Sequence, residues 1–553
     1  MFSRPMTWRR HLRLLSNKRT GWLHTPSESS SESSSESSSS TPGTTTPPFK
    51  VTHSISNPVY VKSIGTQRIL VSSHTLTVPL TSSNKQGPLD DSSPLNCPLT
   101  VHSTVIDLLP SSTSSSKVLN YLNSPAWTSL ERSSKYISLF EQAGSPPIKS
   151  ILYLQGGPGF PSPRIGVSLG IEGDSSWASK ALSSGFNRIV LMDQRGTGHS
   201  SPVTSQTLEL KFGDDVKGKG EYLRFFRATE IVEDAEAFRD VLNGGGRWGA
   251  VLGQSFGGFC LATYLTTGGG AADKIENAIF TGGIPPVFVD DVKEVYDKLW
   301  VKVVERNDKY YEQYPGDVGI VKEIVRALKD DPQKLPGGGV LTARRFLQLG
   351  MSLGGGPGAF EGLHELFATA FVDGAKGEKV ISKNFLRAVE REQPFDTNPI
   401  YALLHESIYC DGENKSSRWA AARSLEAHKL RPLFDFESRC ENGNDDDKVY
   451  FYGEMVFPWM FEDYEELQGL KDVAENLAQR EDWGKLYGEE PVKARGACAV
   501  YHDDMYVDRE LSLEVLDKLL VGVQPWITNE YQHSGLRDAG AMIFNKLMEK
   551  SKD

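Results

Sequence analysis

A serine in a tight, glycine-bounded turn is the residue of this sequence best placed to do chemistry. Residues 253–257 read Gly-Gln-Ser-Phe-Gly, a G-x-S-x-G pattern centred on Ser255. A short apolar run, 248–252, precedes the pattern and a helix-compatible stretch, 259–265, follows it. In that strand–turn–helix context the serine is a nucleophile, and the helix directs its free N–H groups at it. The pattern predicts acyl transfer at Ser255; an idle serine in a structural turn is the alternative.

A second glycine-rich segment could stabilise the oxyanion that such an attack creates. Residues 155–159 read Gln-Gly-Gly-Pro-Gly and follow the apolar run 151–154. Acyl transfer needs two donors aimed at the developing negative charge. The sequence offers the backbone N–H of Phe256, next to the serine, and that of Gly157, with Gly156 as its substitute. Alone, the segment reads equally well as an ordinary Gly-Pro turn.

A serine nucleophile also needs a base, normally a histidine, and a carboxylate that orients it. Where the serine occupies a G-x-S-x-G turn after a parallel strand, the acid and the base follow it in the chain. His533 comes just past the last predicted strand and is the only histidine after residue 502, so it is the predicted base. Three competing histidines are less suitable: His199 precedes the serine, His405 lies in a helical segment, and His502 stands where the acid is expected.

The orienting acid is predicted at the end of another strand. Residues 500–505 read Val-Tyr-His-Asp-Asp-Met, which makes Asp503 and Asp504 both possible. Adjacent residues after a strand point in different directions, so only one of the two can reach His533. The residue pattern itself leaves the choice between them open.

The elements that must hold these groups follow from short apolar runs. Runs that each end in a glycine-containing turn are typical of buried parallel strands, and four occur, at 151–154, 188–192, 248–252 and 278–281. A helical pattern at 229–242 separates two of them, and strands alternating with helices indicate an α/β sheet. After residue 494 the strand signal returns at 497–501 and 524–528, with a helix at 511–521 between them.

The remaining segments differ from this pattern. Residues 68–80 and 98–109 alternate apolar and polar side chains, as half-buried antiparallel strands do, and the Ser-rich stretches 81–96 and 111–117 read as loops. Residues 286–494 predict a mostly helical insertion, with helical periodicity at 289–308 and 317–328 and glycine-rich interruptions at 336–339 and 354–358.

Together these segments resemble the prolyl iminopeptidase family of serine peptidases, within the α/β-hydrolases. The resemblance covers about 51–553 and is carried by the family's HGGPG loop at 156–159, its DQRGxGxS segment at 193–200, its GxSxGG turn at 253–258, and its acid and base at Asp504 and His533. Gln155 stands where the family commonly has histidine. The resemblance favours Asp504, because the family's acid directly precedes the hydrophobic position that Met505 occupies here.

The resemblance implies an α/β-hydrolase fold, with a mostly parallel central sheet flanked by helices and a large, mostly helical cap. The core would comprise 51–285 and 495–553, and the cap 286–494. The implied reaction is release of N-terminal proline, or a similar small residue, from peptides through an acyl-enzyme, with no metal or organic cofactor. An esterase, an amidase or a broader aminopeptidase would use the same triad, and a non-catalytic binding protein could share the fold.

Larger members of this family hold the substrate's free amine with carboxylates of the cap. Glu406 and Glu454 stand in segments that look similar to the family segments carrying those carboxylates. A cationic amine in a partly buried pocket needs a fixed anion as its partner. Four aromatic residues of the same region could wall a prolyl ring: Trp419, Phe457, Trp459 and Phe461. A structural role for both glutamates, and core packing for the aromatic residues, is the alternative.

Composition bounds the partners and the compartment. The chain has 553 residues, a net charge of −11 and five dispersed cysteines, which gives neither a basic nucleic-acid footprint nor a zinc pattern. Unpaired cysteines suit a reducing compartment, and no apolar run is long enough to span a membrane. Residues 1–50 predict a disordered extension. Its basic, acid-free start fits either a mitochondrial transit peptide or a tail on a cytoplasmic enzyme. We expect the cytoplasmic enzyme.

Overall fold

The computed structural model describes most of the chain after residue 50. It covers residues 51–64, 67–81, 93–95, 98–109, 114–140, 147–165, 173, 175–267, 273–441, 444 and 447–553. The predicted extension 1–50, with its possible transit peptide, and most of the predicted loop 81–96 lie outside these residues. None of the helices in the covered ranges combines the length and the apolar character that crossing a membrane requires.

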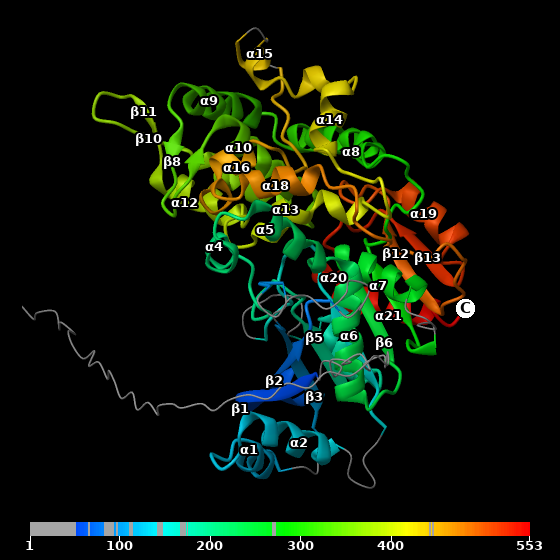
Figure 1. Cartoon of the computed structure of the whole chain (residues 1–553). Helices are drawn as coiled ribbons and strands as arrows, with labels where there is room; N and C mark the ends of the chain where they lie inside the picture. Colours follow the sequence, from blue (N-terminus) through cyan, green and yellow to red (C-terminus); the bar gives the residue numbers. More distant parts are fainter. Residues whose placement is uncertain are drawn as a thin grey trace, which may run out of the picture. The chain divides into compact units, whose positions relative to one another are not determined.

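A nine-stranded sheet with the order β1-β2-β3-β5-β4-β6-β7-β12-β13 organises the structure (Figure 1). Its strands are β1 (Thr52–Ile64), β2 (Gln67–Val78), β3 (Leu99–Leu108), β4 (Ser150–Leu154), β5 (Arg188–Met192), β6 (Ala250–Gln254), β7 (Ala278–Thr281), β12 (Gly496–Tyr501) and β13 (Val523–Thr528). Strands β5 to β13 in this order are parallel, whereas β1, β2, β3 and β5 pair antiparallel. The predicted mostly parallel α/β sheet is confirmed; β1 was not predicted as a strand.

The parallel strands are apolar on both faces because helices cover both. In β4, Leu152 and Leu154 belong to one hydrophobic cluster and Ile151 and Tyr153 to a second, as the two-residue period of a strand requires. The first cluster includes side chains of α6 (Ala228–Asn243) and α7 (Phe256–Thr267). The second includes side chains of α3 (Trp177–Ser183) and α21 (Gly540–Lys550).

Helices also form the connection between β7 and β12, which Figure 1 shows as a group beside the strands. They are α8 (Lys293–Gln313), α9 (Asp317–Asp330), α10 (Ala343–Leu347), α11 (Ala359–Ala368), α12 (Lys383–Glu392), α13 (Pro399–Leu404), α14 (Ala420–Ala427), α15 (Phe436–Glu441), α16 (Met460–Asp463), α17 (Glu465–Gln468) and α18 (Lys471–Ala478). The glycine-rich segment 336–339 joins two short strands, β8 (Gln333–Lys334) and β9 (Val340–Leu341). Another short pair is β10 (Phe371–Asp373) with β11 (Lys379–Ile381).

Further helices lie between strands of the sheet: α1 (Ser115–Leu122), α2 (Ser129–Phe140), α4 (Ser205–Phe212), α5 (Val216–Leu223) and α19 (Arg509–Lys518). A short helix, α20 (Gly535–Asp538), follows β13. The prediction of a loop over 111–117 is wrong at its end, because Ser114 caps α1 and accepts a hydrogen bond from the Lys117 N–H at 3.5 Å. A serine at this position supports a helix start as readily as a loop.

Candidate active site

A cavity of about 850 Å³ lies where the parallel strands end. Gln155 follows β4 and Ser255 follows β6, and both line it. From the other side it is lined by residues of the helical region, including Tyr401 and Glu454. Open α/β sheets bind ligands at this edge, beyond the carboxyl ends of the strands.

Ser255 occupies a strained turn between β6 and α7. Its φ of 55° is in the left-handed region, which costs a non-glycine residue about 1–3 kcal/mol. Hydrogen bonds hold the turn, from Ser255 N–H to Thr281 O at 3.0 Å and from Gly258 N–H to Ser255 O at 2.7 Å. A side chain at Gly257 would collide with the Leu154 carbonyl oxygen. The small neighbours are therefore a steric requirement of the turn.

The glycine loop after β4 packs directly against this serine. A Cβ on Gly156 would lie 2.7 Å from the Ser255 Cβ, and Gly157 has a φ of 124°. Both glycines line the cavity, and no acceptor in the described ranges takes a hydrogen bond from either N–H. Phe256 begins α7, so its N–H is one of the helix's free donors. These three N–H groups can serve as oxyanion donors, and Gly156 is the glycine nearer the nucleophile.

His533 and Asp504 form a buried, oriented pair beside the same cavity. The His533 Nδ1 lies 2.8 Å from Asp504 Oδ2. The other carboxylate oxygen, Oδ1, accepts the N–H groups of Tyr506 at 2.9 Å and Val507 at 3.1 Å. The Tyr506 ring meets the imidazole edge-on at 4.8 Å between centroids. This arrangement fixes the ring and leaves Nε2 available to exchange a proton with a hydroxyl.

Asp503 has different partners. Its carboxylate lies 3.0 Å from Lys309 Nζ and 2.8 Å from Nδ1 of His502, which is exposed. Partial burial acts to raise the pKa of the Asp503 carboxyl, but hydrogen bonds from His502 and Lys309 outweigh it and lower that pKa to about 2. Asp503 therefore makes a surface ion pair, and Asp504 is the residue that contacts His533.

The DQRG segment, whose role the sequence did not reveal, holds the glycine loop. Gln194 Nε2 donates to the Gln155 carbonyl at 2.9 Å, directly before the two glycines. Arg195 anchors the segment through a bidentate ion pair with Asp234, with Nε donating to Oδ2 at 2.8 Å and Nη2 donating to Oδ1 at 2.7 Å. All three polar side chains are buried. Only a contact map could have revealed this role, because the partners are distant in sequence.

Asp193 of the same segment lies in the one group of potential metal ligands found among the described residues. Ligand atoms of His102, Asp193 and His199 lie within 4.8 Å of one another. However, the Arg164 guanidinium is already paired with Asp193 Oδ2, and the Ser162 N–H donates to Oδ1 at 3.0 Å. A cation would have to displace this arginine, so we assign no metal to the cluster.

Glu454 brings an unpaired carboxylate to the cavity. The residue is 8 % exposed, and no group of the described ranges donates a hydrogen bond to its carboxylate. The nearest charged or titratable nitrogen is Nε2 of His405, at 3.9 Å. Burial, and then the charge of Asp504, raise the pKa of the Glu454 carboxyl well above its usual range. A cationic ligand in the cavity would supply the missing partner.

Glu406 is also buried, but its carboxylate is already bonded. It accepts the N–H groups of Ala420 and Ala421, each at 2.9 Å, where α14 begins. Burial raises the pKa of its carboxyl to about 7, against these hydrogen bonds. Glu406 is not among the residues that line the cavity. Its predicted contact with the substrate amine therefore has no support from its neighbours.

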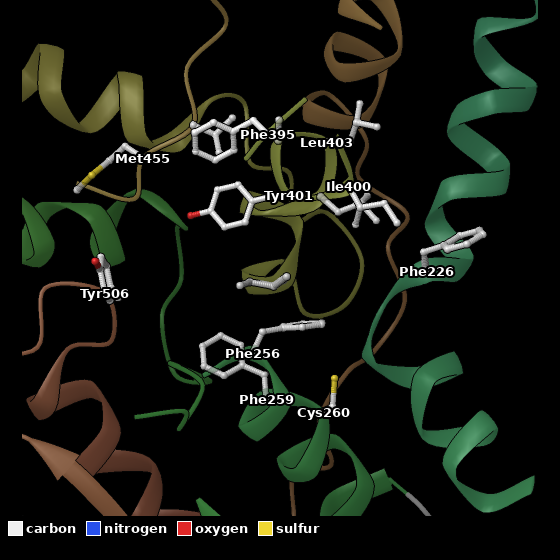
Figure 2. Close-up of a cluster of buried hydrophobic side chains, with 14 of the residues drawn as sticks. Phe226, Phe256, Phe259, Cys260, Phe395, Ile400, Tyr401, Leu403, Met455 and Tyr506 are labelled. Atoms are coloured by element: carbon white, nitrogen blue, oxygen red, sulfur yellow. The ribbon is translucent and has the colours of Figure 1, made fainter. Parts of the chain in front are cut away.

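The apolar wall of the cavity comes from residues that the sequence did not single out. The structure shows Phe160, Phe395 and Tyr401 on this wall, with ring centroids 5.7 Å (Phe160–Tyr401) and 5.2 Å (Phe395–Tyr401) apart. Figure 2 shows Tyr401 and Phe395 in one apolar cluster with Phe256 of α7 and with Tyr506. The prediction that Trp419, Phe457, Trp459 and Phe461 wall the cavity is wrong, because none of them is among its lining residues and their rings pack in pairs, Trp419 with Phe461 and Phe457 with Trp459.

Comparison with known proteins agrees with this architecture. Residues 149–325 match the family model described as alpha/beta hydrolase fold. A proline iminopeptidase of Aeromonas sobria is 40 % identical over 408 residues, which cover 73 % of this chain and 87 % of the relative. The chain belongs to the proline iminopeptidase family. The proline iminopeptidase aneH of Aspergillus aculeatus is 34 % identical over 417 residues, covering 74 % of this chain and 86 % of that one.

Solved structures that match this iminopeptidase-family chain are more distant. An esterase of Exiguobacterium antarcticum is 12 % identical, with a TM-score of 0.31, and covers 74 % of this chain and 93 % of that one. Esterase E22 is 9 % identical, with a TM-score of 0.38, and covers 87 % of this chain and 100 % of its own. The assignment to the proline iminopeptidase family therefore depends on the sequence relatives.

Proposed function

We propose that this protein is a serine exopeptidase that releases N-terminal proline from peptides. The observation that carries the proposal is the unpaired, buried Glu454 carboxylate in the same cavity as Ser255 and His533. An esterase has no use for a buried anion at this position, whereas a peptide with a free N-terminus presents a cation to it. The names of the two relatives point to the same substrate class.

In the proposed reaction Ser255 Oγ attacks the prolyl carbonyl carbon while His533 Nε2 accepts the hydroxyl proton. The carbonyl electrons move onto oxygen, where N–H groups from Phe256 and from Gly157 or Gly156 stabilise the charge. Collapse of this intermediate breaks the C–N bond, and His533 gives its proton to the leaving nitrogen. Water then attacks the prolyl ester with His533 as the base, and proline leaves as Ser255 regains its proton.

Asp504 and Glu454 have separate tasks in this scheme. Asp504 keeps the imidazole in the tautomer that presents Nε2 to the serine and stabilises the imidazolium form. Glu454 pairs with the secondary ammonium of the N-terminal proline and thereby sets which end of a peptide enters. Pro394 and the rings of Phe160, Phe395 and Tyr401 offer apolar surface to the pyrrolidine ring.

The test compares the full chain with its Ser255→Ala variant on four substrates. These are prolyl-arylamide, alanyl-arylamide, N-blocked prolyl-arylamide and a short acyl ester. We expect fast release from the free prolyl substrate, with a loss of at least 10²-fold in kcat/KM on blocking its amine, since a buried charge pair is removed. The Ser255→Ala variant should lose about 10⁴-fold or more.

Two results would contradict the proposal. Equal cleavage of free and blocked prolyl-arylamide would remove amine recognition, and turnover of the ester alone would leave a serine hydrolase with another acyl substrate. A faster reaction with alanyl- than with prolyl-arylamide would retain the exopeptidase but change its preference to a broader aminopeptidase.

We propose the cytoplasm as the compartment in which this reaction occurs. The four cysteines in the described ranges, Cys260, Cys410, Cys440 and Cys498, are unpaired and buried, which suits a reducing environment. Import into mitochondria is the alternative, and fractionation of cells that express the full chain distinguishes the two compartments.

A further inference from the structure

Arg537 is a positive charge at the solvent side of the active-site cavity. It lies on α20, four residues after His533, and its backbone N–H donates to Ser534 O at 2.7 Å. Of the lysines and arginines that the structure describes, it alone lines the cavity. Its side chain is exposed, and no carboxylate of the described residues lies within ion-pair distance of it. The neighbouring Asp538 is instead bonded to the Ser534 hydroxyl.

The lining of the cavity therefore combines a buried acidic side chain with an exposed basic one. Glu454 is buried, Ser255 is partly buried and Arg537 is exposed. Both groups affect the pKa of the Tyr506 phenol: burial and then Glu454 raise this pKa, whereas Arg537 acts to lower it. Burial raises the pKa of the Tyr153 phenol, and Arg537 acts to lower it. The Tyr153 hydroxyl donates to Gln155 Oε1 at 2.8 Å beside the glycine loop.

We propose that Arg537 binds the C-terminal carboxylate of short peptides, so that prolyl di- and tripeptides are the preferred substrates. This inference depends on the proposed iminopeptidase function and names its substrate class. A peptide whose N-terminal ammonium pairs with Glu454 places its scissile carbonyl at Ser255 and its leaving residues toward the exposed Arg537, where the free carboxylate meets the guanidinium.

The charges of the cavity lining agree with this orientation. Two residues span at most about 7 Å and three about 10 Å when extended, so in a short peptide the carboxylate stays close to the scissile bond. A guanidinium binds a carboxylate through two parallel hydrogen bonds. The other charged residues at the mouth, Glu365 and Glu392, are exposed acids that repel a carboxylate. Arg537 is therefore the group that attracts it.

The experiment compares Pro-Gly with Pro-Gly-amide, which differ only in the terminal charge, using the full chain. We expect the wild type to prefer the free acid by on the order of fivefold in kcat/KM, since the contact is partly solvated. Arg537→Gln should reduce this ratio to about one, and Arg537→Lys should retain part of it. Lys546→Gln removes an exposed charge of α21 away from the cavity and should keep the wild-type ratio.

Because the ratio is taken within each variant, a general loss of activity does not affect it, and circular dichroism reports folding separately. The inference is overturned if the wild type cleaves acid and amide equally well, or if Arg537→Gln keeps the preference. Hydrolysis of prolyl-arylamide, which has no carboxylate, is measured in parallel. If the wild type fails on that substrate, the proposed function itself is wrong; if it succeeds while the ratio is one, only the role of Arg537 is lost.

Discussion

Two buried carboxyl groups, one on each side of the cavity, differ in how they are hydrogen-bonded. On the side of the strand ends, both oxygens of Asp504 accept hydrogen bonds, and Gln194 is bonded to the glycine loop. On the side of the helical region, Glu454 has no hydrogen-bond donor among the described residues, and neither ring nitrogen of His405 has a partner there. Burial lowers the pKa of His405 to about 3, so this imidazole is neutral.

In the proposed reaction, this difference corresponds to separate groups for catalysis and for substrate recognition. Groups that act on the transition state work best when the protein already holds them in place, because no reorganisation is then needed. A buried anion without a partner is instead costly until a ligand arrives. The strand-end groups should therefore affect every substrate alike, whereas the helical-side groups should affect only substrates with a free amine.

The largest expected effect concerns the acid. Asp504→Asn should lower kcat about 10⁴-fold on free and blocked substrates alike, because the amide stabilises the wrong imidazole tautomer. Asp503→Asn, the matched control one residue away, should change kcat less than about threefold, since the described partners of its carboxylate are Lys309 and the exposed His502. Steady-state kinetics of both variants decide the point. A larger loss in Asp503→Asn would reassign the acid.

The two glutamates give the second largest effect. Glu454→Gln should lower kcat/KM for prolyl-arylamide by about 10²–10³-fold, as expected for loss of one partner of a buried ion pair, and should abolish the preference for a free amine. Glu406→Gln should keep that preference and instead lose about 1 kcal/mol of stability, because one N–H at the start of α14 loses its acceptor. If Glu406→Gln also abolished the preference, Glu406 would join Glu454 in amine binding.

These two glutamates also show where sequence reasoning ends. The nucleophile turn, the glycine loop and the strands before them are local patterns with a local steric cause, so they could be predicted. The candidate acid and base depended on a chain order that the fold imposes. Glu406 and Glu454, by contrast, look equivalent in sequence. Their environments diverge because α14 starts at Ala420, after a left-handed Trp419 with a φ of 56°, and gives Glu406 two donors.

The lining of the cavity was unpredictable for the same reason. Aromatic residues near Glu454 in sequence pack against one another in the helical region. The wall comes instead from Phe160 in the loop after β4, from Phe395 and from Tyr401 of α13. The contact between Gln194 and the Gln155 carbonyl likewise joins two strand ends that are distant in the chain. Which side chains meet across such distances depends on packing, which periodicity does not encode.

Two buried glutamines test the comparison with a smaller effect. Gln194 holds the glycine loop, and Gln348 donates to Gly453 O at 2.9 Å and Met455 O at 3.0 Å, on either side of Glu454. Gln194→Ala should lower kcat about tenfold with little change in KM, because the displaced loop binds the oxyanion less well. Gln348→Ala should mainly raise KM for free-amine substrates.

The readout for this pair is the division of each effect between kcat and KM, on free and on N-blocked prolyl-arylamide. The two glutamines have the same size and both are buried, so each variant controls for the cavity that the other creates. If both variants changed kcat and KM in the same proportion, the proposed separation of the two sides would fail.

The smallest effect should be a gain in thermal stability when Glu454 is neutralised. Its carboxyl has a raised pKa in the folded protein, so between the unfolded pKa of about 4.3 and the folded value the unfolded state binds fewer protons. Folding therefore becomes less favourable as pH rises through this window, and the penalty is complete above the folded pKa. Glu454→Gln removes the penalty. Without substrate, its melting temperature should equal that of the wild type near pH 4 and exceed it by about 1–3 °C at pH 8.

Glu392→Gln provides the matched control, because Glu392 lines the same cavity but is exposed. This substitution should leave the difference in melting temperature flat with pH. Calorimetry of the three proteins at several pH values measures the effect directly. A Glu454→Gln variant that melts below the wild type at pH 8 would mean that the carboxylate already has a stabilising partner in the empty cavity. The contrast between the hydrogen-bonded Asp504 carboxylate and the unpaired Glu454 carboxylate would then fail.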